Sequence, residues 1–251
     1  MDRLNKLIDI SIAKDFCGQR SVQGLRTPGL LARRPLIGLL MVLLGGVVFG
    51  VIAWSFQTGG RFAQLDVSVA DRIHAVALQS PKYVVDLMIL GFYLGEHGIV
   101  LIGFLLLACF GVKRFWPEFT MVVVAWAGEG LIWTVLSGYF NRPRPEFDVS
   151  VWRQMTVPGF PSGHSISAVM CFGLLAYLVV PFMRRRVWKA VVIAAAVGII
   201  LFIGFSRIFV GDHYLTDVLA GYALGIAWCG LAYTVIELLF KRRILENVQP
   251  K

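Results

Sequence analysis

Three short polar segments in an otherwise apolar chain carry the residue types that phosphoryl transfer needs. They read Asn-Arg-Pro-Arg-Pro at 141–145, Pro-Ser-Gly-His at 161–164, and Ser-Arg-Ile-Phe-Val-Gly-Asp-His-Tyr-Leu-Thr-Asp at 206–217. Arginine offers a planar fork of donors that matches phosphate oxygens and offsets their charge. A Ser-Gly pair that opens a helix adds backbone N–H groups and the positive end of the helix dipole. Together these segments favour a site that binds and transfers a phosphoryl group.

His213 and Asp217 stand four residues apart at the start of an apolar run. At that spacing the two side chains share one face of a helix. A carboxylate bonded to one ring nitrogen fixes the tautomer and makes the other nitrogen a better nucleophile. The pair therefore predicts an activated histidine, and His164 is left to protonate the leaving oxygen and to activate water.

The elements that must position these residues are membrane-spanning helices. The 251-residue chain is 57% hydrophobic and only 16% charged, whereas a soluble domain carries about 25% charged residues. About 20 apolar residues cross a bilayer as a helix. Six runs qualify: 35–54, about 96–112, about 118–138, Ser162 to before Arg184, about 188–206 and about 214–240. We predict an all-α polytopic protein with six transmembrane helices, in which the mixed segment 55–95 is an extramembrane or interfacial excursion.

The basic residues indicate how the spans are oriented. Of the 24 Lys/Arg, 17 lie before span one, after spans two and four, or after span six. Because cytoplasmic loops carry excess Lys/Arg, both termini are expected in the cytoplasm, and 55–95, 139–161 and 207–213 are expected outside. The predicted organisation is a cytoplasmic amphipathic segment at 1–34, a six-span domain at 35–240 and a basic cytoplasmic tail at 241–251. A bacterial inner membrane is the expected setting for so compact a chain.

Charge and cysteine content exclude other classes. The net charge is +9, but the basic residues cluster between apolar runs instead of forming a nucleic-acid-binding face. The four cysteines are scattered, without the close spacing of a zinc site or a disulfide framework. We expect neither a nucleic acid nor an obligate protein partner.

At the three polar segments the chain resembles the type 2 phosphatidic acid phosphatase (PAP2) superfamily of membrane lipid phosphatases, which shares its helical core with vanadium haloperoxidases. That pattern is Lys-x6-Arg-Pro, then Pro-Ser-Gly-His, then Ser-Arg-x5-His-x3-Asp. The second part matches at 161–164, the third matches from Ser206 to Asp217, and the arginine-proline of the first matches at Arg144-Pro145. The resemblance covers roughly residues 85–238.

The resemblance implies a role for each matched residue. His213 is the expected nucleophile that forms a phosphohistidine, Asp217 orients it, and His164 is the general acid. The residues expected to hold the phosphate are Arg144, Ser162, Gly163 and Arg207. No metal cofactor is implied, because arginines supply the positive charge that Mg²⁺ supplies in other phosphoryl-transfer sites.

The chain departs from the pattern at Ser137, where the family has its leading lysine. A charge-assisted contact of that kind is commonly worth about 1.5–3 kcal/mol. Arg142 could replace the lysine at the phosphate, since it lies two residues from Arg144. The departure bears on rate and substrate preference more than on the chemistry.

Several other polar residues have open interpretations. A charge in mid-span, such as Glu129, is expensive and often functional, although a helix-packing role explains it as well. Glu96 and His97 could rim the site. Arg61, Arg72 and Arg153 are expected to contact lipid headgroups, and a metal site that combines His213 and Asp217 with His164, His97 or His74 is the less favoured alternative.

The expected function is hydrolysis of a terminal phosphate from a lipid phosphate or diphosphate at the outer leaflet. Undecaprenyl diphosphate, phosphatidate, phosphatidylglycerophosphate and phosphorylated lipid A all fit the motifs, with undecaprenyl diphosphate slightly preferred. Two alternatives remain. One is a phosphotransferase that uses the same phosphohistidine, and the other is a lipid-binding or transport protein without catalytic activity.

Overall fold

The computed structural model describes residues 34–149, 151–152 and 156–248, and within these ranges every regular element is a helix. The predicted all-α class is therefore confirmed. The elements are α5 (Pro35–Gln57), α6 (Arg61–Gln79), α7 (Lys82–Tyr93), the π-helical turn η1 (Leu94–Gly98), α8 (Ile99–Val112), α9 (Trp116–Phe140), α10 (Gly163–Val179), the 3₁₀ turn η2 (Val180–Phe182), α11 (Arg186–Phe209) and α12 (Leu215–Val248). Apart from residue 34, the predicted amphipathic segment 1–34 lies outside the described residues.

Six helices are long and apolar enough to cross a membrane, as the sequence predicts. The second of them begins at Lys82, because α7, η1 and α8 form one continuous span of 31 residues. The prediction that this span starts near residue 96 was therefore wrong. Two of its charged residues, Lys82 and Asp86, lie near the beginning of α7 and form an exposed ion pair with a distance of 2.9 Å between Nζ and Oδ2. The residues that follow in α7 are apolar.

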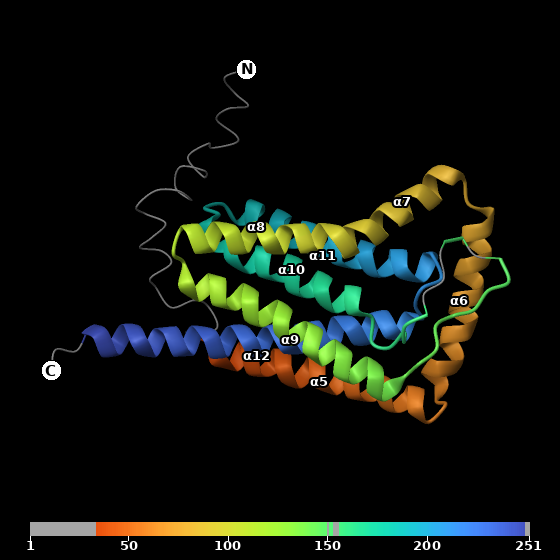
Figure 1. Cartoon of the computed structure of the whole chain (residues 1–251), viewed down its shortest axis with the longest axis horizontal. Coiled ribbons are helices and arrows are strands. Elements are labelled where there is room, and N and C mark those ends of the chain that lie inside the picture. The colour runs from red at the N-terminus through yellow and green to blue at the C-terminus, as the bar shows by residue number, and fades with distance from the viewer. Residues whose placement is uncertain (1–33, 150, 153–155, 249–251) are drawn as a thin grey trace, which may run out of the picture.

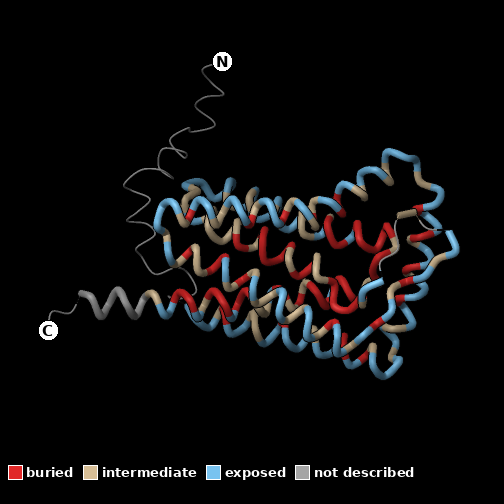
Figure 2. The backbone as a smooth tube through the Cα atoms, in the orientation of Figure 1, coloured by how far each residue is buried: buried red, intermediate tan, exposed pale blue. Residues whose placement is uncertain are grey.

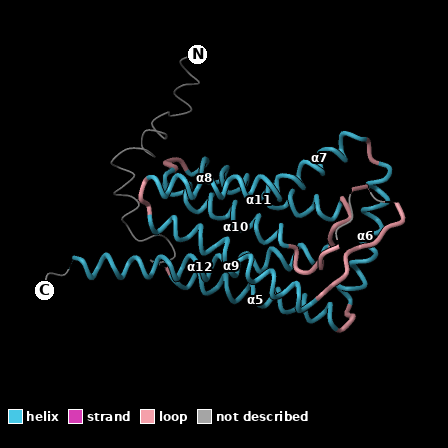
Figure 3. Tube along the Cα trace, in the orientation of Figure 1, coloured by secondary structure: helices cyan, strands magenta, loops and turns pink. Residues whose placement is uncertain are grey.

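The polar segments gather at one end of the bundle. Figure 1 shows that α6 lies across this end, whereas the last turns of α12 lie at the opposite end. The loops that follow α9 and α11 run beside α6 (Figure 3). The mixed segment therefore contains a helix that covers the end of the bundle where the three motifs meet. Helix α12 itself continues through 241–248, into the predicted tail.

The core is built around α10 and α12, which contain the largest share of buried residues among the spans. Figure 2 shows this buried zone inside the bundle and the exposed surface around it. Two glycines allow α12 to approach α10 closely: a Cβ at Gly221 would lie 2.6 Å from the Ser162 carbonyl oxygen, and one at Gly225 would lie 2.9 Å from Cβ of Val169. Large apolar side chains, such as Leu44 and Phe104, are exposed on the outside of the bundle, as expected for helices in contact with lipid.

Candidate active site

His213 lies in the tight turn between α11 and α12. The backbone N–H groups of Asp212 and His213 donate to the Arg207 carbonyl oxygen at 2.9 and 3.3 Å, which closes the turn. The His213 side chain is buried. Arg144 lies beside it, with 3.2 Å between Nη1 of the arginine and Nε2 of the histidine.

The contact with Arg144 favours one tautomer of His213. Arg144 also donates from Nη1 to the Asp212 carbonyl oxygen at 2.9 Å and from Nε to the Val157 carbonyl oxygen at 2.8 Å, so its fork is firmly held. Because a guanidinium only donates, the contact to His213 requires a lone pair on Nε2. The ring proton is then on Nδ1, which lies 3.5 Å from Oδ2 of Asp217. In this tautomer the lone pair of Nε2 is on the side of Arg144.

Asp217 connects its own motif, Ser206 to Asp217, with the Pro-Ser-Gly-His motif at 161–164. Its Oδ2 accepts a hydrogen bond from the Tyr214 backbone N–H at 2.9 Å, at the beginning of α12. Its backbone carbonyl accepts from the N–H of Ser162 at 3.0 Å. The carboxylate is completely buried and is therefore held in one orientation beside His213.

Arg142 contacts the other side of Asp217. It donates from Nη1 to Oδ1 of Asp217 at 2.6 Å and to Oγ1 of Thr216 at 2.9 Å, and from Nη2 to Oδ2 of Asp66 at 2.8 Å. Ser137 is buried, and its hydroxyl donates to the Thr134 carbonyl oxygen at 3.3 Å. These contacts favour a role for Arg142 in holding Asp217. Its suggested replacement of the family lysine at the phosphate stays a prediction.

Arg207 is fixed by the kinked second span. Its guanidinium is buried, stacks over the ring of Phe92 at 3.7 Å and donates from Nη2 to the Phe92 carbonyl oxygen at 2.7 Å. Its Nη1 lies 3.7 Å from Oδ2 of Asp212. The arginine therefore has partners both in its own turn and in α7.

Ser162, Gly163 and His164 form the start of α10. The Ser162 hydroxyl makes no capping hydrogen bond to the first turn of α10. Gly163 packs against the indole of Trp133. His164 is partly buried, with its ring centroid 6.0 Å from that of Phe92. The Pro-Ser-Gly-His motif therefore approaches Phe92, the same residue that contacts Arg207.

The π-helical turn η1 lies against both of these motifs. A Cβ at Gly95 would lie 3.0 Å from Nη2 of Arg207 and 3.7 Å from Cδ2 of His164. Only a residue without a side chain allows the span to approach this closely. Such turns frequently occur at functional sites. Nothing in the sequence pattern singles out Gly95 as a residue of this site.

The charges around His213 favour its neutral form. Burial, followed by the positive charges of Arg144 and Arg207, holds the pKa of His213 well below its usual range. Burial also lowers the pKa of Arg144, which the carboxylates of Asp212 and Asp217 partly counteract. The His213 ring is therefore unprotonated at neutral pH, beside arginines that can receive an anion.

This depressed pKa has a consequence for stability. Below the ordinary histidine pKa of about 6.5, the unfolded chain binds a proton at His213 that the folded chain does not bind. The stability associated with the neutral ring is therefore complete above that pH and is lost as the pH falls toward the folded-state pKa. In detergent, the Tm of the wild type should fall more between pH 7.5 and pH 5 than the Tm of His213→Gln. Equal losses would contradict the depressed pKa.

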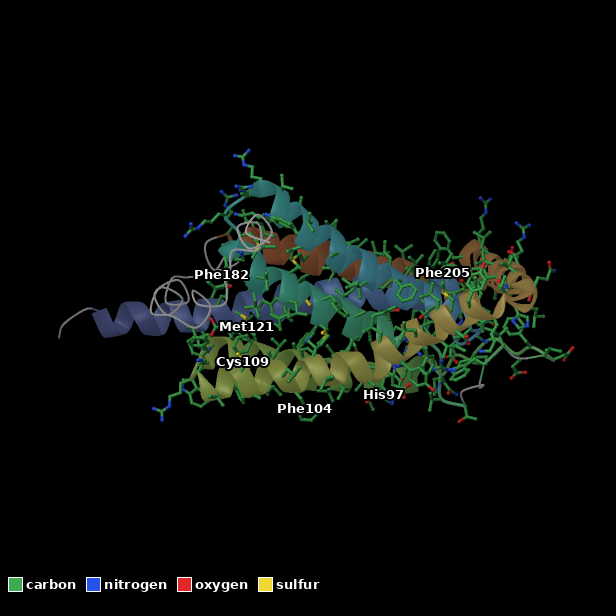
Figure 4. The ribbon with its side chains drawn as sticks, turned by 90° about the horizontal axis from the view of Figure 1, so that it is seen from above. His97, Phe104, Cys109, Met121, Phe182 and Phe205 are labelled. Carbon is green, nitrogen blue, oxygen red and sulfur yellow. The ribbon has the colours of Figure 1, made fainter. Side chains whose placement is uncertain are left out.

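The remaining polar residues have specific places. The Ser167 hydroxyl contacts both Oε1 of Glu129 at 2.9 Å and the Gly163 carbonyl oxygen at 3.0 Å, which connects this glutamate to the first turn of α10. His97 is exposed, with its ring 5.7 Å from that of Tyr93, and lies nearer the α6 end of its span than Phe104 (Figure 4). In the part of the chain that the structure describes, no cluster of three His, Cys, Asp or Glu could hold a metal ion. Metal independence stays a prediction.

Sequence reasoning did not assign Asp66 to the site. It lies on α6, far from the motifs in sequence, yet its carboxylate contacts both Arg142 and Thr216. A signal is visible in retrospect: Asp66, Ala70, His74 and Ala77 form the buried face of α6. A carboxylate at helical spacing from two alanines indicates a buried face with a specific partner.

Several known proteins have sequences similar to this chain. The family model of the PAP2 superfamily matches residues 118–241. Phosphatidylglycerophosphatase B of Bacillus subtilis is 32% identical over 131 residues, which cover 51% of this chain and 61% of that protein. A lipid A 1-phosphatase of Rhizobium johnstonii is 26% identical over 223 residues, which cover 80% of this chain and 82% of that protein. The chain thus spans about three fifths of the first relative's length.

A solved structure has the same fold. The crystal structure of a transmembrane PAP2-type phosphatidylglycerolphosphate phosphatase from Bacillus subtilis superposes with a TM-score of 0.62 at 24% sequence identity. The superposition covers 84% of this chain and 98% of that one. The family model and the similar sequences agree with the three motifs at one end of the bundle: residues 118–241 of this chain, which contain all three motifs, form a PAP2-superfamily domain.

Proposed function

We propose that this protein is a membrane lipid phosphatase that works through a phosphohistidine at His213. The observation that carries the proposal is the pair of contacts on its ring: Nε2 lies 3.2 Å from Nη1 of Arg144, and Nδ1 lies 3.5 Å from Oδ2 of Asp217. One contact places a cation where a phosphate oxygen would bind, and the other orients the nucleophile. The relatives are named as phosphatases, which supports the same class of reaction.

The reaction has two steps. In the first, Nε2 of His213 attacks phosphorus in line, the bond from phosphorus to the leaving oxygen breaks, and His164 gives that oxygen a proton. In the second, His164 takes a proton from water, the resulting hydroxide attacks phosphorus, and the electron pair of the P–N bond returns to Nε2. Arg144, Arg207 and the start of α10 stabilise the charge that develops on the phosphate oxygens.

The proposed substrate is a lipid that carries a terminal phosphate or diphosphate. The motifs lie at one end of a bundle whose surface is apolar, so a headgroup can bind there while acyl or prenyl chains stay in the bilayer. The distribution of Lys/Arg supports cytoplasmic termini and an active site on the outer face. The bacterial names among the relatives support an inner-membrane location.

The test is phosphate release by the purified protein in detergent. The panel contains undecaprenyl diphosphate, phosphatidate, phosphatidylglycerophosphate and 1-phosphorylated lipid A, each assayed with and without EDTA. We expect release from at least one lipid and no loss of rate in EDTA, because arginines provide the positive charge at the site. Loss of activity in EDTA would contradict the metal-independent mechanism.

The same assay separates hydrolysis from transfer. With ³²P-labelled substrate and an unlabelled acceptor lipid, a phosphatase moves the label to inorganic phosphate. Label that moves to the acceptor lipid would replace hydrolysis by phosphotransfer. If the label stays on the original lipid throughout the panel, the proposal of catalysis is wrong.

A further inference from the structure

Helix α6 buries a carboxylate next to the candidate active site. Asp66 is only 1% exposed and belongs to the buried face of α6. This helix lies across the end of the bundle (Figure 1). A buried carboxylate is costly unless hydrogen bonds and opposite charge compensate it. The contacts of Asp66 therefore indicate what this helix does.

Asp66 binds the first turn of α12 directly. Its Oδ1 accepts a hydrogen bond from the Thr216 backbone N–H at 2.9 Å, and its Oδ2 accepts from the Thr216 hydroxyl. Thr216 is the second residue of α12, where helical N–H groups have no partner within the helix. Asp66 therefore caps α12 from another helix, one residue before Asp217.

Asp66 also shares an arginine with Asp217. Arg142 bridges the two carboxylates, with 2.8 Å from Nη2 to Oδ2 of Asp66 and 2.6 Å from Nη1 to Oδ1 of Asp217. All three side chains are at most 5% exposed. The rings of Phe56 and Tyr214 lie 4.6 and 4.3 Å from the guanidinium carbon. Arg142 is thus fixed in place, and Oδ2 of Asp217 remains on the side of His213.

We propose that Asp66 is a positioning residue for the nucleophile. It acts through Arg142 and Thr216 to fix Asp217, and Asp217 in turn orients His213. Helix α6, which lies outside the matched motifs, therefore contributes one residue, Asp66, to the positioning of the nucleophile. This inference rests on the proposed function, since it concerns the reactivity of His213.

The main test is Asp66→Asn, assayed with the lipid that the panel identifies. Asparagine keeps the shape and an acceptor for Thr216 but removes the charge that balances Arg142. A small displacement of a reacting group can cost about 100-fold in rate. We expect kcat to fall about 10- to 100-fold, with KM changed less than about twofold. The matched control is Asp71→Asn, on the exposed side of the same helix, which should retain the wild-type kcat.

Two inhibitors distinguish positioning from a general loss of structure. Orthovanadate imitates the five-coordinate transition state and needs a bond from Nε2, whereas inorganic phosphate needs only the cationic pocket. In Asp66→Asn, the Ki of vanadate should rise by about the same factor as kcat falls, and the Ki of phosphate should stay within about twofold. Equal weakening of both inhibitors, or a kcat equal to that of Asp71→Asn, would overturn the proposal.

A double-mutant cycle tests the route through Arg142. If Asp66 acts through this arginine, Asp66→Asn should reduce kcat less than about twofold in an Arg142→Gln background. Effects that multiply would mean that Asp66 acts independently of Arg142, contrary to the proposal.

Two further variants keep the test decisive. If Asp66→Asn does not fold, Thr216→Val removes the hydroxyl that contacts both Asp66 and Arg142, and it should lower kcat about 3- to 10-fold with the same separation between vanadate and phosphate. An unchanged kcat in Thr216→Val would contradict the proposal. His213→Ala, assayed alongside, separates the two hypotheses: if it is active, the proposed function fails, whereas if it is inactive and Asp66→Asn behaves as wild type, only the role of Asp66 fails.

Discussion

Replacing His213 with alanine should reduce phosphate release by at least about 10⁴-fold. The ring is the proposed nucleophile, and it lies between Arg144 and Asp217. Because Arg144 and Arg207 remain, the variant should still bind inorganic phosphate. The measurement is kcat on the best lipid of the panel, together with the Ki of phosphate.

The matched control for this variant is His97→Ala, which removes an exposed histidine from η1. It should keep the wild-type rate. Because His213→Ala leaves a space beside Arg144, added imidazole should restore part of the lost activity. The mechanism would be refuted by a His213→Ala variant that keeps more than a tenth of the wild-type kcat.

Replacing His164 with alanine should lower kcat about 10²- to 10⁴-fold on a lipid phosphate, the usual contribution of a general acid–base group. A lipid alkoxide is a poor leaving group and needs the proton that His164 supplies. The phenolate of an aryl phosphate is a better leaving group and departs without that proton. The deficit of His164→Ala in the first step should therefore be much smaller for an aryl phosphate, measured by the initial burst of released phenol.

The second step provides an internal check on this assignment. After the burst, the variant should turn over slowly on every substrate, because His164 also activates water. A His164→Ala variant with the same deficit on lipid and aryl phosphates in the burst would show that the residue does not act as a general acid. His97→Ala serves again as the control for loss of a histidine.

The sequence predicts the parts of the site that local spacing determines. The pair His213 and Asp217 could be recognised because four residues make one helical turn. The gathering of Arg144, His164 and Arg207 at one end could be predicted because all three adjoin the same ends of hydrophobic spans. These predictions require only span boundaries and an orientation.

Contacts between distant segments could not be predicted in the same way. Asp66 and Thr216 are 150 residues apart, and no periodic pattern connects them. The start of the second span could not be recognised because Lys82 and Asp86 add two charges to its first turns. In the structure these two charges form an ion pair at the edge of the span. Gly95 is one of 26 glycines, and its importance depends on how a π-helical turn meets two other helices.

The way Arg142 and Arg207 are held also determines which pieces of this protein can be exchanged with those of a relative. The family model begins at residue 118, but Asp66 and the Phe92 carbonyl, which bind these two arginines, lie before it. A chimera that transplanted only 118–241 would separate each arginine from a native partner. A chimera that is meant to carry the substrate specificity of one relative into another should therefore be active only if it includes α6 and the α7–α8 span together with the motif-bearing helices.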